Sequence, residues 1–336
     1  MTSPHIDTTH SAKSDAADVA VIVVNYGTAD LALQAVDSVL MRDHRGLKVE
    51  VHLVDNASPG DDAARLARAL EIPARAGQVT FYPETTNHGF GRGNNLVLRA
   101  LAARPCAPHF VFLLNPDARL KTDTLADLAA FLDDHPQAAV VGAGIDRPDG
   151  GSPVTAAFRF PCAISEFSDS MRFGPLTRLT SHWTVALPST TPTQQVDWVS
   201  GAALMARLDV LKTVNFFDPD FFLYFEETEL MHRLHQVGWE TWYCAEARIE
   251  HVAGASTGMH AGRSTPRPAY WFDSWRFYFC KTQGLWGARL CALARLGGSM
   301  AHAGISILRR RQLSYERGFP SDFTRKVMRP LFYRGS

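Results

Sequence analysis

The sequence predicts an α/β fold in which a mainly parallel central sheet is flanked by helices. Segments rich in β-branched residues alternate with segments whose apolar residues recur at helical spacing. The strand-like segments are continuous apolar runs, which are typical of parallel strands covered on both faces. Of the 336 residues, 46% are hydrophobic and 20% charged, a composition that suffices to bury such a core.

The first half of the chain carries the alternation. Residues 1–18 are polar and are predicted to be a disordered lead-in. The elements that follow are strand 19–24, helix Ala29–Leu40, strand 49–54, helix 61–70, strand 79–82, a Gly- and Asn-rich turn at 87–93, helix 94–103, strand Phe110–Leu114, helix 122–133 and strand 140–143. Because ligands bind beyond the carboxyl ends of such strands, this order singles out Asn25, Asp55, Asn115 and Asp117.

The second half is less regular. Sequence rich in Pro, Ser, Thr and Gln between residues 146 and 197 predicts loops over the sheet edge. Order returns with segment 198–207, an aromatic run at 221–225, a helix at 226–237 and a strand at 240–244. Apolar residues at helical spacing between 285 and 308 predict a helical C-terminal extension, placed at residues 266–336, after a main domain at residues 19–265.

Charge is unevenly distributed along the chain. Basic and acidic residues number 34 each, yet from Leu285 to Ser336 ten Lys and Arg accompany one Glu and one Asp. An amphipathic helix with a basic flank suits contact with an anionic bilayer surface, although packing on the core or on a second subunit would use the same pattern. The arginine-rich end lacks interleaved aromatic residues and any known module, so no nucleic-acid partner is predicted.

The cysteines and the ends of the chain bear on its location. Five widely spaced cysteines without a CxxC pair indicate neither a zinc knuckle nor a disulfide framework. No signal-like segment opens the sequence, and no apolar run is long enough to span a membrane. We therefore expect a cytoplasmic protein.

Acidic residues at the ends of buried segments could carry chemistry. Asp55 could accept the N3 proton of uracil or thymine, or it could simply form a turn or helix cap. Asp117 ends the most apolar strand, where Mg²⁺ or Mn²⁺ and a diphosphate could meet it, unless it belongs to an ordinary tight turn. Glu226 and Glu227 follow five hydrophobic residues and open a helix, so burial and the helix start could tune a general base. Helix capping explains acidic residues at a helix start, but it does not explain why so apolar a segment comes before them.

Two further features depend on the fold for their meaning. His251 follows a strand-like segment and could bind a metal held by Asp117, although a lone His is more often structural. The string NHGFGRGNN, which begins at Asn87, supplies three glycines and a helix start, and these suit close backbone approach to a ligand. Its position and spacing differ from those of the dinucleotide-binding fingerprint.

Six motifs gain specificity from their order and spacing: VIVVNY, VHLVDNAS, NHGFGRGNN, FLLNPD, DWVSGAALMAR and FFLYFEETEL. Together they resemble family 2 glycosyltransferases of the GT-A fold, and within them bacterial rhamnosyltransferases of cell-surface polysaccharide (lipopolysaccharide) assembly. The resemblance covers about residues 19–256. It implies a Rossmann-like GT-A domain followed by a helical C-terminal extension.

On the donor side, the resemblance implies roles for matching residues. Asp55 would hold the donor base, and Asn25 and Tyr26 would line its pocket. The other implied donor-binding residues are Asn87, Gly89, Gly91, Asn94 and Asn115.

The resemblance also implies the metal site and the catalytic base. Asp117 corresponds to the last acid of the family's DxD-type metal motif, whose first position is Asn115 here, and His251 would complete coordination of Mg²⁺ or Mn²⁺. Glu227 aligns with the second acid of the family's ED-type pair, the catalytic base, where Asp is frequent, and Glu226 would support it. Two residues would line the sugar and acceptor pocket, Trp198 and Gly201.

The function implied by the resemblance is an inverting sugar transfer. The donor would be a nucleoside diphosphate sugar of the dTDP or UDP type, in particular dTDP-L-rhamnose, and the acceptor a hydroxyl of a saccharide or of a polyprenyl-diphosphate-linked saccharide. Because related enzymes use lipid-linked acceptors, the resemblance also implies peripheral attachment to the inner face of the cytoplasmic membrane. The alternatives are a non-catalytic nucleotide-sugar binding protein and a sugar nucleotidyltransferase, which would want a basic, Gly-rich phosphate loop where VVNYGTAD stands.

Overall fold

A computed structural model of the chain describes residues 16–252, 266–310 and 318–333. The predicted disordered lead-in, residues 1–18, lies almost wholly outside the described residues. So does the predicted domain boundary at residue 265.

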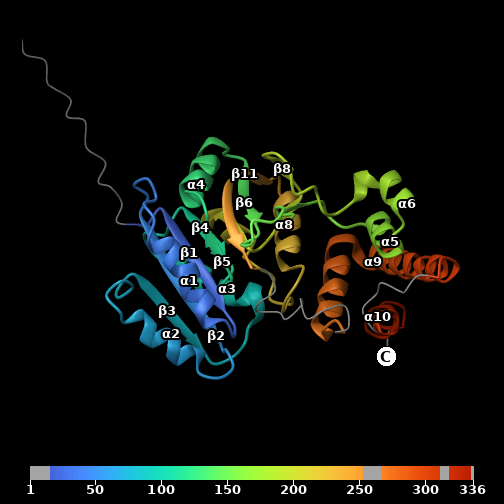
Figure 1. Cartoon of the computed structure of the whole chain (residues 1–336), viewed down its shortest axis with the longest axis horizontal. Helices are drawn as coiled ribbons and strands as arrows, with labels where there is room; N and C mark the ends of the chain where they lie inside the picture. Colours follow the sequence, from blue (N-terminus) through green and yellow to red (C-terminus); the bar gives the residue numbers. More distant parts are fainter. Residues whose placement is uncertain (1–15, 253–265, 311–317, 334–336) are drawn as a thin grey trace, which may run out of the picture.

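The described residues contain a nine-stranded sheet at the centre of the molecule (Figure 1). Its strand order is β3-β2-β1-β4-β10-β6-β11-β5, with β8 paired to β11. The strands are β1 (Val19–Asn25), β2 (Val49–Asn56), β3 (Val79–Glu84), β4 (Phe110–Leu114), β5 (Ala118–Leu120), β6 (Ala138–Asp146), β8 (Gln194–Val196), β10 (Ala203–Arg207) and β11 (Glu240–His251).

The sheet changes direction on both sides of β10, and again where β5 and β8 pair with β11. Strands β3, β2, β1 and β4 are mutually parallel, whereas β10 pairs antiparallel with β4 on one side and with β6 on the other. The parallel register places Asn25 directly opposite Asp55 at the carboxyl ends of β1 and β2. The predicted mainly parallel sheet flanked by helices is confirmed, with antiparallel β10 at its centre.

Apolar strands and one-sided helices explain the main core. The strands β1 and β4 are buried along almost their whole length, as expected for strands covered on both faces. Helix α1 (Ala29–Leu40) turns a stripe of Ala and Val at helical spacing towards the sheet. The other helices of this part are α2 (Asp62–Leu70), α3 (Gly89–Ala102), α4 (Thr124–Asp134), α7 (Leu208–Thr213) and α8 (Glu226–Gln236).

Two sequence expectations are wrong. Helix α3 begins at Gly89, five residues before the predicted start at Asn94. The region predicted to form loops contains α5 (Ala163–Met171), α6 (Gly174–Leu179) and strand β7 (Ala157–Phe158), which pairs with β9 (Trp198–Val199). Helix α5 escaped prediction because four of the residues that it buries are polar: Ser165, Glu166, Ser168 and Ser170.

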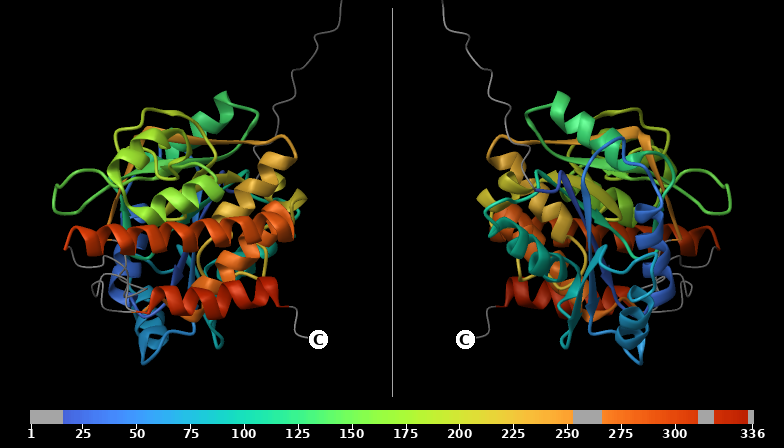
Figure 2. Two further views of the ribbon diagram at one scale, coloured as in Figure 1. Left: turned by 90° about the vertical axis from the view of Figure 1, so that its right-hand side faces the viewer. Right: turned by 90° about the vertical axis from the view of Figure 1, so that its left-hand side faces the viewer.

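The C-terminal part forms a second lobe. Helix α9 (Ala269–Leu308) is broken at Gly284, whose backbone is left-handed (φ 69°), so it consists of two helices. An aromatic cluster, which includes Phe221, Trp275 and Phe323, joins α9 to α10 (Phe319–Phe323) and α11 (Arg329–Phe332). Figure 2 shows the second part of α9 running across this lobe, and Figure 1 places α5 and α6 beside it. None of the described helices is both long and apolar enough to span a membrane.

Candidate active site

A cavity of about 350 Å³ opens at the carboxyl ends of the parallel strands. Its wall is built by the ends of β1, β2 and β4, the start of α3, the segment before α8 and the first turn of α9. The lining residues used below are Tyr26, Asn56, Asn87, Gly89, Phe90, Asn115, Phe222, Leu223 and Tyr270. The cavity therefore lies where parallel α/β sheets bind ligands.

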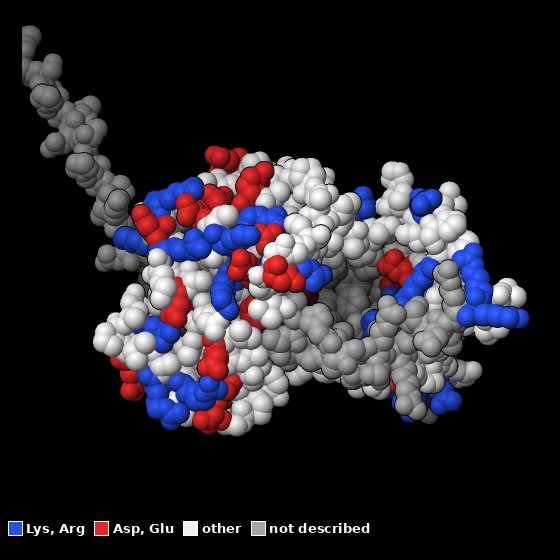
Figure 3. Space-filling view, in the orientation of Figure 1, with Lys and Arg blue, Asp and Glu red and all other residues white. Residues whose placement is uncertain are grey.

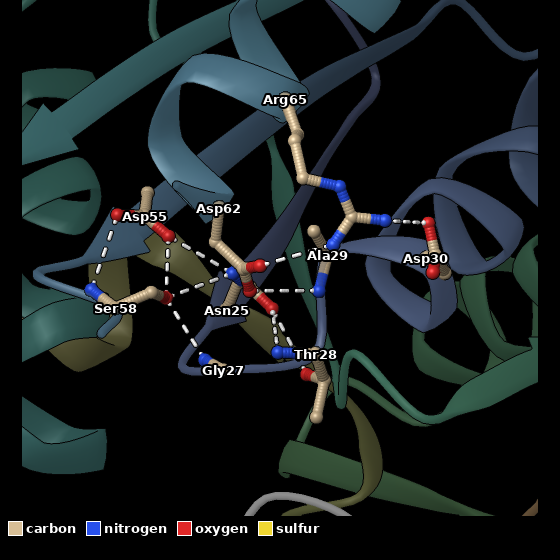
Figure 4. Close-up of polar contacts among 9 residues, drawn as sticks. All are labelled: Asn25, Gly27, Thr28, Ala29, Asp30, Asp55, Ser58, Asp62 and Arg65. Atoms are coloured by element: carbon tan, nitrogen blue, oxygen red, sulfur yellow. Dashed lines mark hydrogen bonds and ion pairs between the residues drawn. The ribbon is translucent and has the colours of Figure 1, made fainter. Parts of the chain in front are cut away.

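Asp55 lies behind this wall in a hydrogen-bonded network (Figure 4). It is only 1% exposed, and its Oδ1 accepts bonds from Asn25 Nδ2 (2.9 Å) and Ser58 Oγ (2.6 Å). The backbone N–H of Ser58 donates to the other oxygen, at 3.2 Å. Both carboxylate oxygens thus accept bonds from the chain itself. Of the predicted base-binding trio, Tyr26 lines the cavity, whereas Asp55 and Asn25 support its rim.

The rim is fixed by side chains that bond the backbone after β1. Asn25 Oδ1 accepts bonds from the Thr28 backbone N–H and hydroxyl, at 3.1 and 2.9 Å. Asp62 accepts the Ala29 N–H at 3.0 Å, and Ser58 Oγ accepts that of Gly27 at 2.9 Å. These bonds satisfy N–H groups that the start of α1 would otherwise leave unpaired. They also fix the turn that carries Tyr26 at the cavity mouth.

Two glycines of the NHGFGRGNN string, Gly89 and Gly91, serve close packing between α3 and the segment before α8. A Cβ on Gly89 would lie 1.8 Å from the carbonyl oxygen of Phe222, which already accepts the Phe90 N–H at 3.1 Å. A Cβ on Gly91 would lie 3.0 Å from Cβ of Phe217 and 3.5 Å from Cβ of Glu226. Gly91 therefore faces the start of α8 rather than the cavity.

Some of the remaining predicted donor-binding residues line the cavity, and one does not. Asn87 and Asn115 line the cavity, and Asn87 Oδ1 accepts bonds from Asn56 Nδ2 (3.1 Å) and the Gly89 N–H (2.8 Å). Asn94 is buried and donates to the Phe90 carbonyl at 3.0 Å. Asn94 thus holds α3 together, away from the cavity lining.

Asp117 and His251 meet at the end of β4, although 134 residues separate them in the chain. The His251 Nε2 lies 2.9 Å from Asp117 Oδ1 and 3.4 Å from Asn115 Nδ2. The Val252 N–H also donates to the Asp117 carbonyl, at 3.0 Å. The predicted proximity of Asp117 and His251 is therefore present in the fold.

These side chains fit a divalent cation. Metal bonds of about 2.1 Å at right angles separate neighbouring ligand atoms by about 3 Å, close to the Asp117–His251 distance. Carboxylate, imidazole and amide groups are suitable donors for Mg²⁺ or Mn²⁺. The described residues hold no group of three or more His, Cys, Asp and Glu side chains that could bind a metal, so donor phosphate oxygens would have to complete the coordination.

Glu226 and Glu227 begin α8 after a strained turn. The two preceding residues, Tyr224 and Phe225, both have left-handed backbones, with φ of 73° and 68°. Such a conformation is costly for aromatic residues and persists only where surrounding packing enforces it, often at functional sites. Here the packing comes from the aromatic cluster of the C-terminal lobe, against which both rings lie.

Burial sets the protonation of the pair. Glu226 is 2% exposed, and burial, followed by the charge of Glu227, raises its pKa well above the usual carboxyl value. Burial also raises the pKa of Glu227, but backbone N–H groups, including that of Gly201, oppose this rise. Within the described residues, Oε2 of each glutamate has no hydrogen-bond partner. Proton binding is therefore favoured at both glutamates, and more strongly at Glu226 than at Glu227.

The two residues predicted to line the acceptor pocket lie in different surroundings. A Cβ on Gly201 would lie 3.3 Å from the Phe90 ring and 3.6 Å from Glu227 Oε1, so Gly201 borders the Glu227 carboxylate. The Trp198 ring stacks on Phe158 with centroids 4.0 Å apart, and its N–H donates to the Arg159 carbonyl. Trp198 does not line the cavity described above.

A contact between the end of β4 and the segment just before β10 brings the acidic motifs near one another. The Asn115 N–H donates to the Ala202 carbonyl at 2.9 Å, which joins the end of β4 to the segment next to Gly201. Gly201 in turn borders Glu227, and Phe90 lies between Gly201 and the cavity. The metal-binding candidates and the general-base candidate therefore lie near one end of the sheet, next to lining residues of the cavity, although none of their own side chains lines it.

Sequence reasoning missed several lining residues. Asn56 could have been found, because it directly follows Asp55 at a strand end. Phe222 and Leu223 carry no polar signal, and they reach the cavity through their backbone course before α8. Tyr270 comes from the first turn of α9, beyond the predicted domain boundary, and its ring packs against Phe222 (centroids 5.3 Å apart). No local pattern marks it.

Comparisons with known proteins agree with this geometry. A sequence model of the family described as "Glycosyltransferase like family 2" matches residues 16–270. The chain is 28% identical over 287 residues to the N-acetylglucosaminyl-diphospho-decaprenol L-rhamnosyltransferase of Mycobacterium tuberculosis, covering 80% of this chain and 89% of that protein. It is 25% identical over 168 residues to the rhamnosyltransferase WbbL of Escherichia coli, covering 49% of this chain and 61% of that protein.

Solved structures support the fold. The mannosyltransferase of Pyrobaculum calidifontis, in complex with GDP-Man and Mn²⁺, superposes with a TM-score of 0.56 at 16% identity over 97% of this chain and 92% of that chain. TarS 1-349 of S. aureus superposes with a TM-score of 0.51 at 14% identity over 94% of this chain and 82% of that chain. The predicted GT-A fold is confirmed. Because the family's sequence model spans most of the chain, the protein belongs to glycosyltransferase family 2 and is a glycosyltransferase.

Proposed function

We propose that this glycosyltransferase moves L-rhamnose from dTDP-L-rhamnose to a hydroxyl of a saccharide carried on a polyprenyl diphosphate, with inversion at the sugar carbon. The observation that carries the proposal is the position of the Asp117–His251 contact and the buried Glu226–Glu227 pair beside the cavity at the carboxyl ends of the strands, next to its lining residues Asn115 and Phe90. The sugar is suggested by the names of both rhamnosyltransferase relatives, and the lipid carrier by the name of the Mycobacterium tuberculosis relative.

In the proposed reaction, Glu227 accepts the proton of the acceptor hydroxyl. The hydroxyl oxygen bonds to the anomeric carbon on the face opposite the diphosphate, and the bond to the leaving oxygen breaks with its electron pair. The sugar passes through an oxocarbenium-like state, as in glycoside hydrolysis. The raised pKa of Glu227 makes it a stronger base than an exposed carboxylate, while protonated Glu226 adds no second negative charge.

Donor binding is proposed to use the other end of the cavity. Tyr26 would contact the nucleotide base at a rim held by Asn25 and Asp55, and Asn56 and Asn115 would face the diphosphate. Asp117 and His251 would hold Mg²⁺ or Mn²⁺, which neutralises charge on the leaving diphosphate when it is bound.

The test of catalysis replaces Glu227 with Gln. Turnover should fall by about 10² to 10⁴, the usual contribution of general-base help, while calorimetry should still detect donor binding. Glu71→Gln, at an exposed position at the end of α2, is the matched control and should leave both unchanged. An active Glu227→Gln enzyme would remove this residue from the base role.

The donor and acceptor are tested separately. The enzyme is incubated with Mg²⁺ or Mn²⁺, a lipid-linked acceptor and a panel of dTDP- and UDP-sugars, and consumption of each sugar nucleotide is measured. The proposal expects dTDP-L-rhamnose to be consumed fastest. Binding without turnover across all acceptors would instead indicate a nucleotide-sugar binding protein.

A lipid-linked acceptor bears on where in the cell the protein acts. We propose that the protein is cytoplasmic and acts at the inner face of the cytoplasmic membrane, where an acceptor on a polyprenyl carrier would be presented to it. The expected observation is enzyme recovered with washed membranes at low salt and released at high salt.

A further inference from the structure

The second part of α9 carries large apolar side chains on its exposed side. Six of them recur at helical spacing, and their exposed fractions run from 50% at Leu293 to 85% at Leu308. We call this set the outward face of α9; it consists of Trp286, Leu290, Leu293, Met300, Ile307 and Leu308. Contiguous apolar side chains of this kind on a protein surface mark an interaction site more often than an accident of packing.

The inner side of the same helix is built from small residues. Its buried residues are Ala288, Cys291, Ala292, Gly298, Ser299 and Ser306. A Cβ on Gly298 would lie 2.1 Å from Ser170 Oγ and 2.4 Å from the Phe167 carbonyl, so the two helices touch closely. A helix that packs only on its own protein buries its large apolar side chains. Here the large apolar side chains lie on the outer side instead, which suits contact with another apolar environment.

The charges around the outward face of α9 indicate which kind of surface would contact it. From Gly284 to Arg310 the sequence has no Asp or Glu, but it has four Arg, of which only Arg295 forms an ion pair with an acidic residue among the described residues. At one end of the outward face, the Arg289 guanidinium lies 4.6 Å from the centre of the Trp286 ring and 5.2 Å from that of Phe332. Arg309 and Arg310 are exposed at the other end. Figure 3 shows blue side chains gathered on the lobe in which α9 ends.

We propose that the outward face of α9 lies on an anionic phospholipid surface, with the helix parallel to the bilayer. The apolar side chains would enter the boundary between headgroups and acyl chains, and the flanking arginines would meet lipid phosphates. Trp286 beside Arg289 suits the membrane interface, where amphipathic aromatic rings collect. A second copy of the chain fits less well, because its own α9 would bring arginines and no carboxylate to the contact.

The surface is independent of the transfer reaction, since it contains no residue placed in the cavity or the catalytic pair. Binding is therefore measured without any sugar nucleotide. The full-length chain is co-sedimented with phosphatidylcholine vesicles, with and without phosphatidylglycerol. The wild type should bind the phosphatidylglycerol vesicles at least tenfold more tightly, and added salt should weaken this binding.

Two variants and one control test the face itself. Leu293→Gln with Met300→Gln, and separately Arg309→Gln with Arg310→Gln, should each weaken binding to phosphatidylglycerol vesicles about tenfold or more. Each of these four side chains is exposed, so circular dichroism should be unchanged. The control pair, Met41→Gln with Ile72→Gln, removes exposed apolar side chains from the other lobe and should bind like the wild type.

Three outcomes would overturn the proposal. In the first, the wild type does not bind phosphatidylglycerol vesicles. In the second, the Leu293/Met300 variant binds them as tightly as the wild type. In the third, sedimentation without lipid finds a dimer that this variant converts to monomer, because a second copy then covers the outward face. A variant that keeps its activity on a short water-soluble acceptor but loses vesicle binding would support it.

Discussion

The buried carboxyl group of Glu226 gives the protein a measurable dependence on pH. Its raised pKa means that the folded state binds this proton more tightly than the unfolded chain does. The stabilisation from the bound proton is therefore complete below the ordinary carboxyl pKa, and it is lost as pH rises towards the folded-state pKa.

Glu226→Gln should remove this loss, because an amide cannot ionise. We expect the variant to melt at a higher temperature than the wild type, with a gain that grows from acidic to alkaline pH. Thermal unfolding across a pH series measures it, with exposed Glu71→Gln as the control. A shift that is the same at every pH would mean that folding does not change the pKa of Glu226.

At the scale of single residues, the sequence located the acidic positions but not all of their surroundings. The strand ends and the resemblance together pointed to Asp55, Asp117 and Glu227. That the oxygens of Asp55 are occupied by Asn25 and Ser58 could not be predicted, because the outcome depends on side-chain rotamers at the rim.

At the scale of elements, the contact between α3 and the segment before α8 rests on Gly89. Its backbone is left-handed (φ +72°), and a Cβ there would also collide with the Phe222 carbonyl. Gly77 has almost the same backbone (φ +73°), but a Cβ added to it would meet no atom within 4 Å, so it offers a matched comparison.

Gly77→Ala should cost about 1 to 2 kcal/mol, the usual penalty of a left-handed alanine. Gly89→Ala should cost clearly more and should also lower turnover, because the displaced Phe222 lies in the segment that delivers Glu226 and Glu227. Urea unfolding and steady-state kinetics measure the two effects. Equal unfolding costs in the two variants would show that the Phe222 contact relaxes without penalty.

The attachment of α9 to α5 rests on a buried ion pair. Arg295 contacts Glu166 through two nitrogens, one at 3.0 Å, and the Trp275 N–H donates to the same carboxylate at 3.0 Å. Glu166 is 4% exposed. Removing one partner of such a pair leaves a charge buried without its counter-ion, and typical costs are about 3 to 5 kcal/mol.

Arg295→Met should therefore destabilise the protein strongly, and adding Glu166→Gln should recover part of the loss, because the neutral amide can still accept the Trp275 bond. The control is Arg325→Met, which breaks an exposed pair with Asp322 and should cost at most about 1 kcal/mol. Urea unfolding compares the three. A double variant no more stable than Arg295→Met would contradict the buried-charge explanation.

Element boundaries were predictable where burial is apolar and one-sided. The β4 strand and the α1 helix agree with prediction at both ends, because an apolar run or stripe marks them. The start of α3 was missed because glycines normally indicate turns, whereas here they permit close helix packing. Helix α5 was missed because the residues that it buries are polar, so its buried side shows no apolar stripe.

At the scale of the whole molecule, ligand binding is linked to global stability. A donor nucleotide at 100 times its dissociation constant should stabilise the folded state by about 2.7 kcal/mol. With Asp117 and His251 as proposed ligands, part of this gain should require Mg²⁺ or Mn²⁺.

Asp117→Asn should therefore reduce the Mn²⁺-dependent part of the thermal shift produced by dTDP, while the shift seen without metal should change little. Thermal unfolding with dTDP, with and without Mn²⁺, measures both parts, and Asp149→Asn at an exposed loop is the control. If Asp117→Asn keeps the full Mn²⁺-dependent thermal shift, the cation binds at another site.

The seam between β4 and β10 has a consequence for engineering. The nucleotide side of the cavity is built by one continuous stretch of chain before the seam, and the glutamate pair and Tyr270 come from the stretch after it. The two stretches meet through the backbone bonds between β4 and β10 and through side-chain-dependent contacts such as Gly89 with Phe222 and Asp117 with His251. A chimera that grafts the later half of a relative onto this half should therefore keep its sugar nucleotide and adopt a new acceptor only when the graft preserves those contacts.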